Sequence, residues 1–240
     1  MNKKKKIRYK RNRMRKRKLM RAALIMLLIL SLLFSMGLVV FIADSIFNIG
    51  LKERASYYFC KEVDIVLDPG HGGKDPGANK GEAIEKEITL EIAHKTKSLL
   101  ENSGYNVILT RDDDSFIELN KRAEFANKRK AKVFVSIHCN SSEDGEGEGI
   151  ETFYTDQKGD ETKYFAEIIQ SSIIEHTNAK NREAKTSNYN VLVHTTMPSV
   201  LVEAGFLTNK SERVLLVTDE YQEKIALGIS EAIKLYLTDN

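Results

Sequence analysis

Three polar side chains of this sequence stand at or just after the ends of expected strands. His71 follows the apolar strand Asp64–Asp68 by three residues, in the turn "DPGHGG". His138 ends the segment "KVFVSIH", and Glu203 ends "SVLVE", which is otherwise apolar. In parallel sheets the carboxyl ends of the strands lie together and carry the functional residues. We therefore expect these three side chains to gather at one edge of a sheet.

Two histidines in one site are typical of a metal centre. A catalytic zinc ion takes three protein ligands and leaves its fourth position to water. The segment "GEAIEKEITLEIA" (81–93) offers carboxylates for the third ligand. One helical stripe runs through four residues at i, i+3, i+7 and i+14, namely Glu85, Ile88, Ile92 and Leu99. The stripe turns Glu85 inward, and because a buried unpaired carboxylate is costly, a metal would supply the partner it needs.

Other residues compete for these roles. Glu87 and Glu91 lie off the stripe and should face water, and an acid in the first helical turn also complements the helix dipole. His94 and His176 lie on expected helices, whereas His194 follows an expected strand and is the stronger competitor for the site. Taken singly, each strand-end residue could equally be a capped or solvated polar group.

The glycines and cysteines narrow the chemistry further. The glycines beside His71 allow a tight turn, but no Walker lysine and no GxGxxG pattern supports a phosphate site. Cys60 and Cys139 have no CxxC partner, which excludes a zinc knuckle and a disulfide framework. Cys139 directly follows His138 on a strand, so we expect its side chain to face the core.

The part of the chain that carries these residues differs in charge from the N-terminal tail. Residues 1–21 carry 13 Lys or Arg and no acid, so the rest has 24 basic and 34 acidic residues out of the totals of 37 and 34. The formal net charge of +3 is thus the sum of a tail of +13 and a body of −10. A basic tail can bind nucleic acid, but the next segment favours a membrane.

Residues 22–43 form an uncharged apolar run of 22 residues. At about 1.5 Å per residue, a helix of this length spans the ~30 Å hydrocarbon core of a bilayer. A cleaved signal peptide has a shorter apolar region and a small-x-small site, and a buried core helix would not adjoin so dense a basic cluster. We expect a retained single-pass anchor in the cell membrane, with a cytoplasmic tail (1–21) that can touch anionic lipid. A linker (44–62) and an extracytoplasmic domain (63–240) follow.

Strand-like and helix-like segments alternate along the body. This alternation predicts one α/β domain with a mostly parallel central sheet flanked by helices and preceded by a transmembrane helix. The expected strands are 64–68, 106–110, 132–138, 149–154, 189–193 and 200–203. The expected helices are 85–100, 117–129, 162–176 and 219–237.

Six motifs in this order carry a family resemblance: "LDPGHGGKDPGA", "EKEITLEIA", "VILTRDDD", "LNKRAEFAN", "VFVSIHCN" and "VLVEAGFLTN". The chain from about Asp64 to Leu237 resembles the zinc-dependent N-acetylmuramoyl-L-alanine amidases of the amidase-3 family. The resemblance implies one zinc ion held by His71, Glu85 and His138, with Glu203 as the catalytic acid/base. It also implies that peptidoglycan is the substrate, cut between N-acetylmuramic acid and the L-alanine of the stem peptide.

Two further residues are weaker substrate-contact candidates. Arg111 in "LTRDDD" either forms a structural ion pair, which we favour, or binds a substrate carboxylate. Asn140 either contacts the sugar or peptide or caps a turn, as asparagines at strand ends often do.

One departure from the resembled family concerns regulation. Some members carry a long helical insertion after the SIH strand that blocks the site, whereas here Gly149 follows His138 by only 11 residues. We therefore expect an open groove, with control by membrane localisation, expression or a protein activator elsewhere. The anchored layout is similar to that of sporulation amidases. A zinc peptidase or deacetylase of another wall polymer, or a non-catalytic wall-binding scaffold, remains an alternative function.

Overall fold

The computed structural model describes Met26 and residues 63–239. The chain forms two compact units, and the second, Lys61–Asn240, contains all elements described below. The expected cytoplasmic tail (1–21), anchor (22–43) and linker (44–62) lie outside the described residues, apart from Met26. Among the residues that are described, no helix combines the length and apolar character needed to cross a membrane.

A six-stranded sheet in the order β4-β1-β5-β8-β6-β7 forms the centre of the second unit. Its strands are β1 (Ile65–Pro69), β4 (Val107–Leu109), β5 (Val133–Asn140), β6 (Ile150–Tyr154), β7 (Asn181–Thr186) and β8 (Ser199–Phe206). All neighbours are parallel except β6 and β8, which are antiparallel. The prediction of a mostly parallel α/β domain is confirmed. A separate two-stranded ribbon consists of β2 (Asn79–Lys80) and β3 (Ala83–Ile84).

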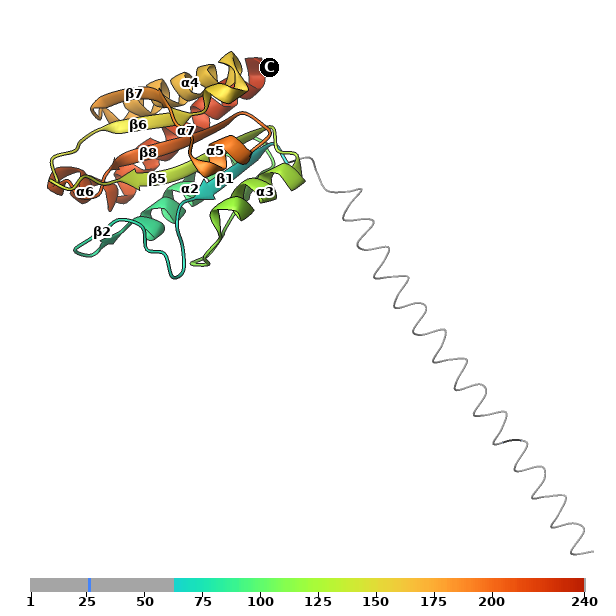
Figure 1. The fold of residues 1–240 in the computed structure, drawn as a ribbon, viewed down its shortest axis with the longest axis horizontal. Coiled ribbons are helices and arrows are strands. Elements are labelled where there is room, and N and C mark those ends of the chain that lie inside the picture. The colour runs from blue at the N-terminus through green and yellow to red at the C-terminus, as the bar shows by residue number, and fades with distance from the viewer. Residues whose placement is uncertain (1–25, 27–62, 240) are drawn as a thin grey trace, which may run out of the picture. The chain divides into compact units, whose positions relative to one another are not determined.

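Helices cover both faces of the sheet (Figure 1). On one face, α2 (Glu85–Asn102), α4 (Asp160–Thr177) and α7 (Asp219–Asp239) enclose the larger core. On the other face, α3 (Leu119–Arg129) and α5 (Asn190–His194) enclose a smaller core that includes Phe134 and Leu201. Two short elements, η1 (Asp156–Lys158) and α6 (Lys210–Leu216), complete the unit.

Alternate residues of the central strands point to these two faces. Ile137 and Cys139 of β5 join the larger core, which confirms the prediction for Cys139, and His138 points to the opposite side. Residues 141–149, which follow β5, form a loop without a helix. The site therefore lies on the face that α3 and α5 cover only in part.

The sequence-based prediction of a strand at 189–193 is wrong, because this segment is the one-turn helix α5. An apolar run of five residues has no period that distinguishes strand from helix. Here Leu192 and Val193 both donate backbone hydrogen bonds to the carbonyl of Tyr189, and Val191 and Leu192 turn into the smaller core. Tertiary packing thus selects the helical turn.

Besides the short elements β2, β3 and η1, the strand β7 and the helix α6 have no counterpart in the expected list. The edge strand β7 is polar except for Ala184 and has no fully buried residue, so it lacks the apolar alternation of a strand. The helix α6 begins at Asn209, whose side chain accepts hydrogen bonds from the backbone amides of Ser211 and Glu212. An asparagine N-cap is a sequence signal that would have indicated this helix.

Candidate metal centre and active site

The turn after β1 brings His71 over the sheet edge. His71 itself adopts a left-handed backbone conformation (φ 60°), which is uncommon for a residue with a side chain. Gly70 has to be glycine, because a Cβ there would lie 2.3 Å from Cε1 of His138. At Gly77, a Cβ would lie 2.5 Å from Oε2 of Glu85, and the residue has φ 67°. Both glycines leave room for the polar side chains to converge.

Glu85, the first residue of α2, lies beneath the two histidines. Its Oε1 is 3.0 Å from Nε2 of His71 and 3.0 Å from Nδ1 of His138. The same oxygen accepts a hydrogen bond from the amide of Cys139 (3.0 Å), and Oε2 accepts one from the amide of Ala78 (2.7 Å). The carboxylate is therefore fixed from the backbone on one side and presented to the histidines on the other.

The helical stripe correctly predicts that Glu85 is buried, and Glu87 and Glu91 are exposed as expected. The prediction is wrong at the C-terminal end of the stripe, where Leu100 and not Leu99 is fully buried. Because 3.6 residues make one turn, the buried stripe drifts around the helix over four turns. The error is at the end of the helix away from the site.

The three side chains form a set of metal-ligand geometry. One ligand atom from each of His71, Glu85 and His138 lies within 4.8 Å of the others, the one such group in the described part of the chain. The remaining nitrogen of His71, Nδ1, lies 2.9 Å from Oδ2 of Asp75. A carboxylate on the second nitrogen of a ligating histidine fixes the tautomer and the ring orientation. Sequence inspection missed Asp75, although it stands four residues after His71 in the same turn.

The electrostatics of the cluster couple its members. Burial lowers the pKa of His71, but hydrogen bonds and charges from Glu85 and Asp75 outweigh it and raise the pKa to about 8. Burial raises the pKa of Glu85, but hydrogen bonds and charges from His138 and His71 outweigh it and hold the pKa well below its usual range. In the metal-free cluster, the contacts with both histidines thus stabilise the charged form of the buried Glu85 carboxylate.

Glu203 on β8 faces this cluster from the neighbouring strand, in register with His138 of β5. Burial raises the pKa of Glu203 to about 7, and the negative charges of Glu85 and Glu151 add to the effect. Its Oε2 is buried and has no hydrogen-bond partner. A carboxyl group with a pKa near neutrality can both accept and return a proton, which is the property of a general acid/base.

A cavity of about 430 Å³ opens in front of His71, His138 and Glu203. Its rim combines these polar groups with apolar side chains from the α3 and α5 segments, among them Phe116, Leu119, Tyr189 and Val191. A pocket with apolar walls and a few convergent titratable groups is the usual form of an enzyme active site.

Arg111 lies under the site and not in its cavity. Its guanidinium, 3% exposed, donates hydrogen bonds to the carbonyls of Pro69 (3.0 Å), Gly70 (2.8 Å) and Lys86 (2.7 Å). Arg111 thereby ties the turn after β1 to the first turn of α2, the two segments that carry His71 and Glu85. Burial lowers the pKa of Arg111.

Asn140 ends β5 beside the site and lines a different part of the surface. Its Nδ2 donates a hydrogen bond to Oε1 of Glu151 (2.6 Å), and its Oδ1 accepts one from the amide of Ser141 (2.8 Å). Both polar atoms of this side chain are thus engaged with neighbouring protein groups.

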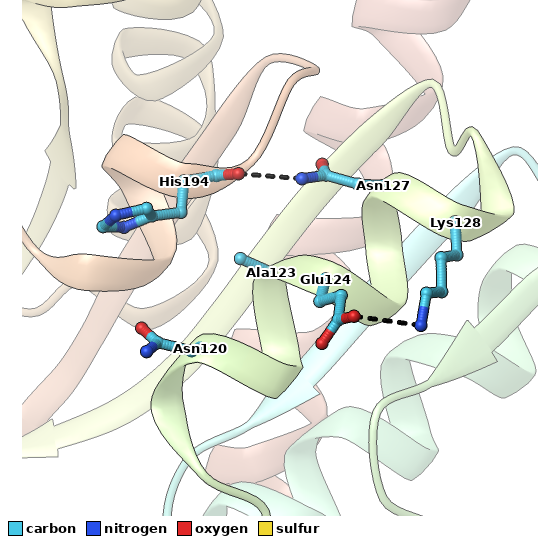
Figure 2. Close-up of a pocket in the computed structure, with 6 residues that line it drawn as sticks. All are labelled: Asn120, Ala123, Glu124, Asn127, Lys128 and His194. Carbon is cyan, nitrogen blue, oxygen red and sulfur yellow. Dashed lines mark hydrogen bonds and ion pairs between the residues drawn. The ribbon is translucent and has the colours of Figure 1, made fainter.

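His194, the competing histidine, lies outside the group formed by His71, Glu85 and His138. It ends α5 in a shallow pocket whose other lining residues, Asn120 to Lys128, belong to α3 (Figure 2). Nδ1 of His194 contacts the carbonyl of Asn190 (2.9 Å), and the carbonyl of His194 accepts a hydrogen bond from Asn127 (2.8 Å). The structure gives His194 a role in joining α5 to α3.

The comparison with known sequences agrees with this site. Residues 65–235 match the family described as N-acetylmuramoyl-L-alanine amidase. The chain belongs to the N-acetylmuramoyl-L-alanine amidase family. Its members hydrolyse peptidoglycan, and this chain is accordingly an amidase of the cell wall.

Relatives of this amidase include a sporulation-specific and a germination-specific enzyme. The sporulation-specific N-acetylmuramoyl-L-alanine amidase of Bacillus subtilis is 36% identical over 174 residues, which cover 72% of this chain and 67% of the relative. The germination-specific amidase of the same species is 34% identical over 190 residues, which cover 73% and 80%.

A solved structure of a relative has the same fold. The CwlD amidase from Clostridioides difficile, determined in complex with the GerS lipoprotein, has a TM-score of 0.71 and 38% sequence identity. The match covers 74% of this chain and 100% of that one. The described unit of this amidase is thus the part that these proteins share.

Proposed function

We propose that this amidase is a zinc hydrolase in which His71, Glu85 and His138 hold the metal and Glu203 acts as acid/base. One observation carries the proposal: three ligand atoms within 4.8 Å of one another lie beside a carboxyl group whose Oε2 is buried without a partner. The substrate bond is the amide that joins N-acetylmuramic acid to the L-alanine of the stem peptide.

The donor set fits zinc. Two imidazole nitrogens and one carboxylate oxygen match the ligands of catalytic zinc sites, which leave one position open. Asp75 on the second nitrogen of His71 supplies the supporting hydrogen bond that such sites carry. The backbone amides of Ala78 and Cys139 hold Glu85 in place before any metal is bound. Zinc, when bound, would lower the pKa of a water molecule and polarise the scissile carbonyl.

The residues of the chain then divide the remaining work. The cavity walls around Tyr189 and Phe116 orient the substrate and exclude bulk water from the reacting bond. Glu203 accepts a proton from the attacking water and returns it to the amide nitrogen as the C–N bond breaks. In the metal-free protein burial raises the pKa of Glu203 to about 7, so both of its protonation states are accessible near neutral pH.

We also propose that residues 22–43 anchor the enzyme in the cell membrane with its catalytic unit outside. The support is the uncharged run of 22 residues behind a tail with 13 basic residues and no acid. An anchor would hold the enzyme near its polymer. Since the related CwlD amidase is known in complex with a lipoprotein, a membrane-bound activator is a reasonable partner for this chain.

The test is digestion of purified peptidoglycan by the full-length chain loaded with zinc. New L-alanine N-termini without new reducing sugar ends are expected. Cleavage within the stem peptide or loss of acetyl groups would instead indicate a peptidase or a deacetylase. Peptidoglycan left intact in every metal, pH and salt condition, and also with a co-expressed lipoprotein, would indicate a scaffold.

Metal content separates the ligands from other histidines. His71→Ala should lose the zinc, measured by atomic absorption after dialysis. His194→Ala is the matched control, because His194 lies in a different pocket, and it should keep one zinc per chain. Equal zinc content in the two variants would contradict the assignment of His71.

A further inference from the structure

The uncovered part of the sheet beside Glu203 carries an unusual ionic cluster. Glu151 of β6 stands in register with Glu203 of β8, on the same face of the sheet as the cavity. Its side chain is 6% exposed, and its Oε2 accepts from Nζ of Lys185 (2.6 Å) and Nε of Arg182 (3.1 Å). Its Oε1 accepts from Asn140. Two cations thus share a single carboxylate oxygen, so one positive charge is not cancelled by Glu151.

The backbone of β7 brings both cations to one side. Ile150 pairs with Asn181 and Thr152 pairs with Ala184, so β7 has two residues opposite Glu151 where a regular strand has one. This is a β-bulge, which changes the direction of the side chains on the bulged strand. Without it, Arg182 and Lys185 would point to opposite faces, because they are three positions apart. Glu183 in the bulge has φ 69°, a left-handed conformation that is uncommon for a residue with a side chain.

The two cations keep donors for a ligand. The side chains of Arg182 and Lys185 are 33% and 41% exposed. Lys185 contacts Glu151, and Arg182 contacts Glu151 and the Glu148 carbonyl (3.4 Å). An ammonium has three donor hydrogens and a guanidinium five, so both groups keep hydrogens for a ligand. The Arg182 guanidinium also lies over the ring of Phe206, 5.0 Å from its centroid, which holds it in place. The cluster is therefore positioned from three sides and open on the fourth.

The cluster lies beside the catalytic cavity, because Glu151 is in register with Glu203, which lines the cavity, and Lys185 is in register with Phe153. Tyr189 lines the cavity and packs edge-on against Phe153 of β6, with ring centroids 5.2 Å apart. Neighbouring strands are about 4.8 Å apart, so the cations on β7 lie roughly 10 Å from Glu203 on β8. An extended peptide advances about 3.5 Å per residue, so the second or third residue beyond the cut bond reaches β7.

We propose that Arg182 and Lys185 form a subsite that binds a carboxylate of the stem peptide beside the reacting amide. The inference rests on the proposed amidase reaction and adds the recognition of its leaving group. A guanidinium and an ammonium are the side chains that proteins use to bind carboxylates. The bulge directs both cations at Glu151, which holds them together in one pre-organised position before the substrate binds.

The experiment compares two soluble fragments of N-acetylmuramic acid and its stem peptide, one with free carboxylates and one fully amidated. The full-length chain with zinc should show a KM about tenfold lower for the free acid, with kcat nearly equal, as expected for one charge-assisted hydrogen bond. Arg182→Gln and Lys185→Gln should each remove most of this preference. Lys180→Gln is the matched control, because Lys180 pairs with the exposed Glu148 and not with Glu151.

Binding measured apart from turnover separates this inference from the proposed reaction. Calorimetric titration of both fragments into Glu203→Gln needs no catalysis. If the free acid binds more tightly but the parent cleaves neither fragment, the proposed reaction is wrong and the subsite stands. If the parent cleaves both with equal KM and both bind equally, the subsite is refuted and the amidase reaction stands. Lys185→Arg keeps the charge and should keep the preference, which excludes a folding defect as the cause.

Discussion

Two carboxylates stand at the carboxyl ends of parallel strands in this amidase, and their surroundings differ: Asp68 is fully buried, whereas Glu203 is half-buried. Asp68 on β1 accepts hydrogen bonds from Thr110 (2.6 Å), Ser136 (2.7 Å) and Arg122 (2.9 Å). Glu203 on β8, two strands away, has one oxygen buried without any partner. Both groups line the same cavity. One carboxylate is fully satisfied by its own chain, and the other is not.

The difference shows what makes a buried acid chemically useful. Asp68 and Arg122 are 0% and 3% exposed, and Arg122 also donates to the carbonyls of Pro69 (2.7 Å) and His71 (2.6 Å). This ion pair fixes the turn that carries His71. Glu203 instead keeps a desolvated oxygen at a pKa of about 7, ready to exchange a proton. Asp68 is the more deeply buried of the two, so the unsatisfied oxygen of Glu203, and not deeper burial, distinguishes the reactive acid from the structural one.

Replacing the reactive acid should have the largest effect. Glu203→Gln keeps the size of the side chain but cannot accept a proton, so we expect kcat to fall about 10³-fold with zinc content unchanged. The release of L-alanine N-termini and atomic absorption measure the two quantities. Glu91→Gln, on the exposed side of α2, is the matched control and should retain the parent rate. Turnover of Glu203→Gln at the parent rate would refute the acid/base role.

Replacing the satisfied acid should affect folding more than chemistry. Asp68→Asn leaves the Arg122 guanidinium buried without its counter-charge, and breaking such a pair costs about 3 kcal/mol of unfolding free energy or more. Urea denaturation followed by circular dichroism measures the loss. Glu124→Gln removes an exposed ion-pair partner on the same helix as Arg122 and should leave the denaturation midpoint unchanged. Equal midpoints for both variants would mean that Asp68 is no more structural than a surface acid.

The pH dependence of stability distinguishes the unsatisfied acid independently of catalysis. The folded pKa of Glu203, about 7, exceeds its ordinary value of 4.5, so the folded state binds more protons between these pH values. Stability therefore falls as pH rises through this window. In the metal-free protein, the unfolding free energy of Glu203→Gln should rise relative to that of the parent by about 2 to 3 kcal/mol between pH 4.5 and pH 7. Parallel stability curves for the two proteins would contradict the raised pKa.

The strand-end rule selects the reactive residues from the sequence but not the network that holds them. His71, His138 and Glu203 stand out because polar residues interrupt apolar strands, and the stripe on α2 turns Glu85 inward. Asp68 also ends an apolar strand, but the sequence did not single it out as a site residue. Nothing local in the sequence shows that Thr110, Arg122 and Ser136 would satisfy it, because these partners come from three other elements 42 to 68 residues away.

The same limit applies to the fold. Long amphipathic helices and buried strands were predicted from their periodicity, since each carries its own apolar pattern. The exposed strand β7 and the one-turn helix α5 carry no such pattern and depend on their neighbours. The strand β7 contributes Arg182 and Lys185 to the surface beside Glu203, and Tyr189 directly precedes α5. The parts of the site that recognise substrate were thus harder to predict than the parts that do chemistry.

The smallest predicted effect concerns Lys158, a partly buried ammonium that donates its hydrogen bonds to neutral oxygens. Lys158 donates to Thr195 Oγ1 (2.6 Å), Ser199 Oγ (2.7 Å) and the carbonyl of Met197 (3.1 Å). Burial lowers the pKa of Lys158 from 10.5 to about 8. The unfolded state then binds more protons between pH 8 and pH 10.5, so stability due to this group rises with pH, opposite in sign to Glu203.

Lys158→Met tests this slope, measured by urea denaturation at pH 8 and pH 10. As pH rises, the unfolding free energy of the parent should increase relative to that of the variant. The change should be smaller than the one for Glu203→Gln, because Lys158 is only partly buried and water screens its charge. Lys163→Met, an exposed lysine on α4, should show no such gain. A flat difference for Lys158→Met would mean that three neutral oxygens stabilise an ammonium as well as water does. Hydrogen-bond satisfaction alone would then account for the contrast between Asp68 and Glu203.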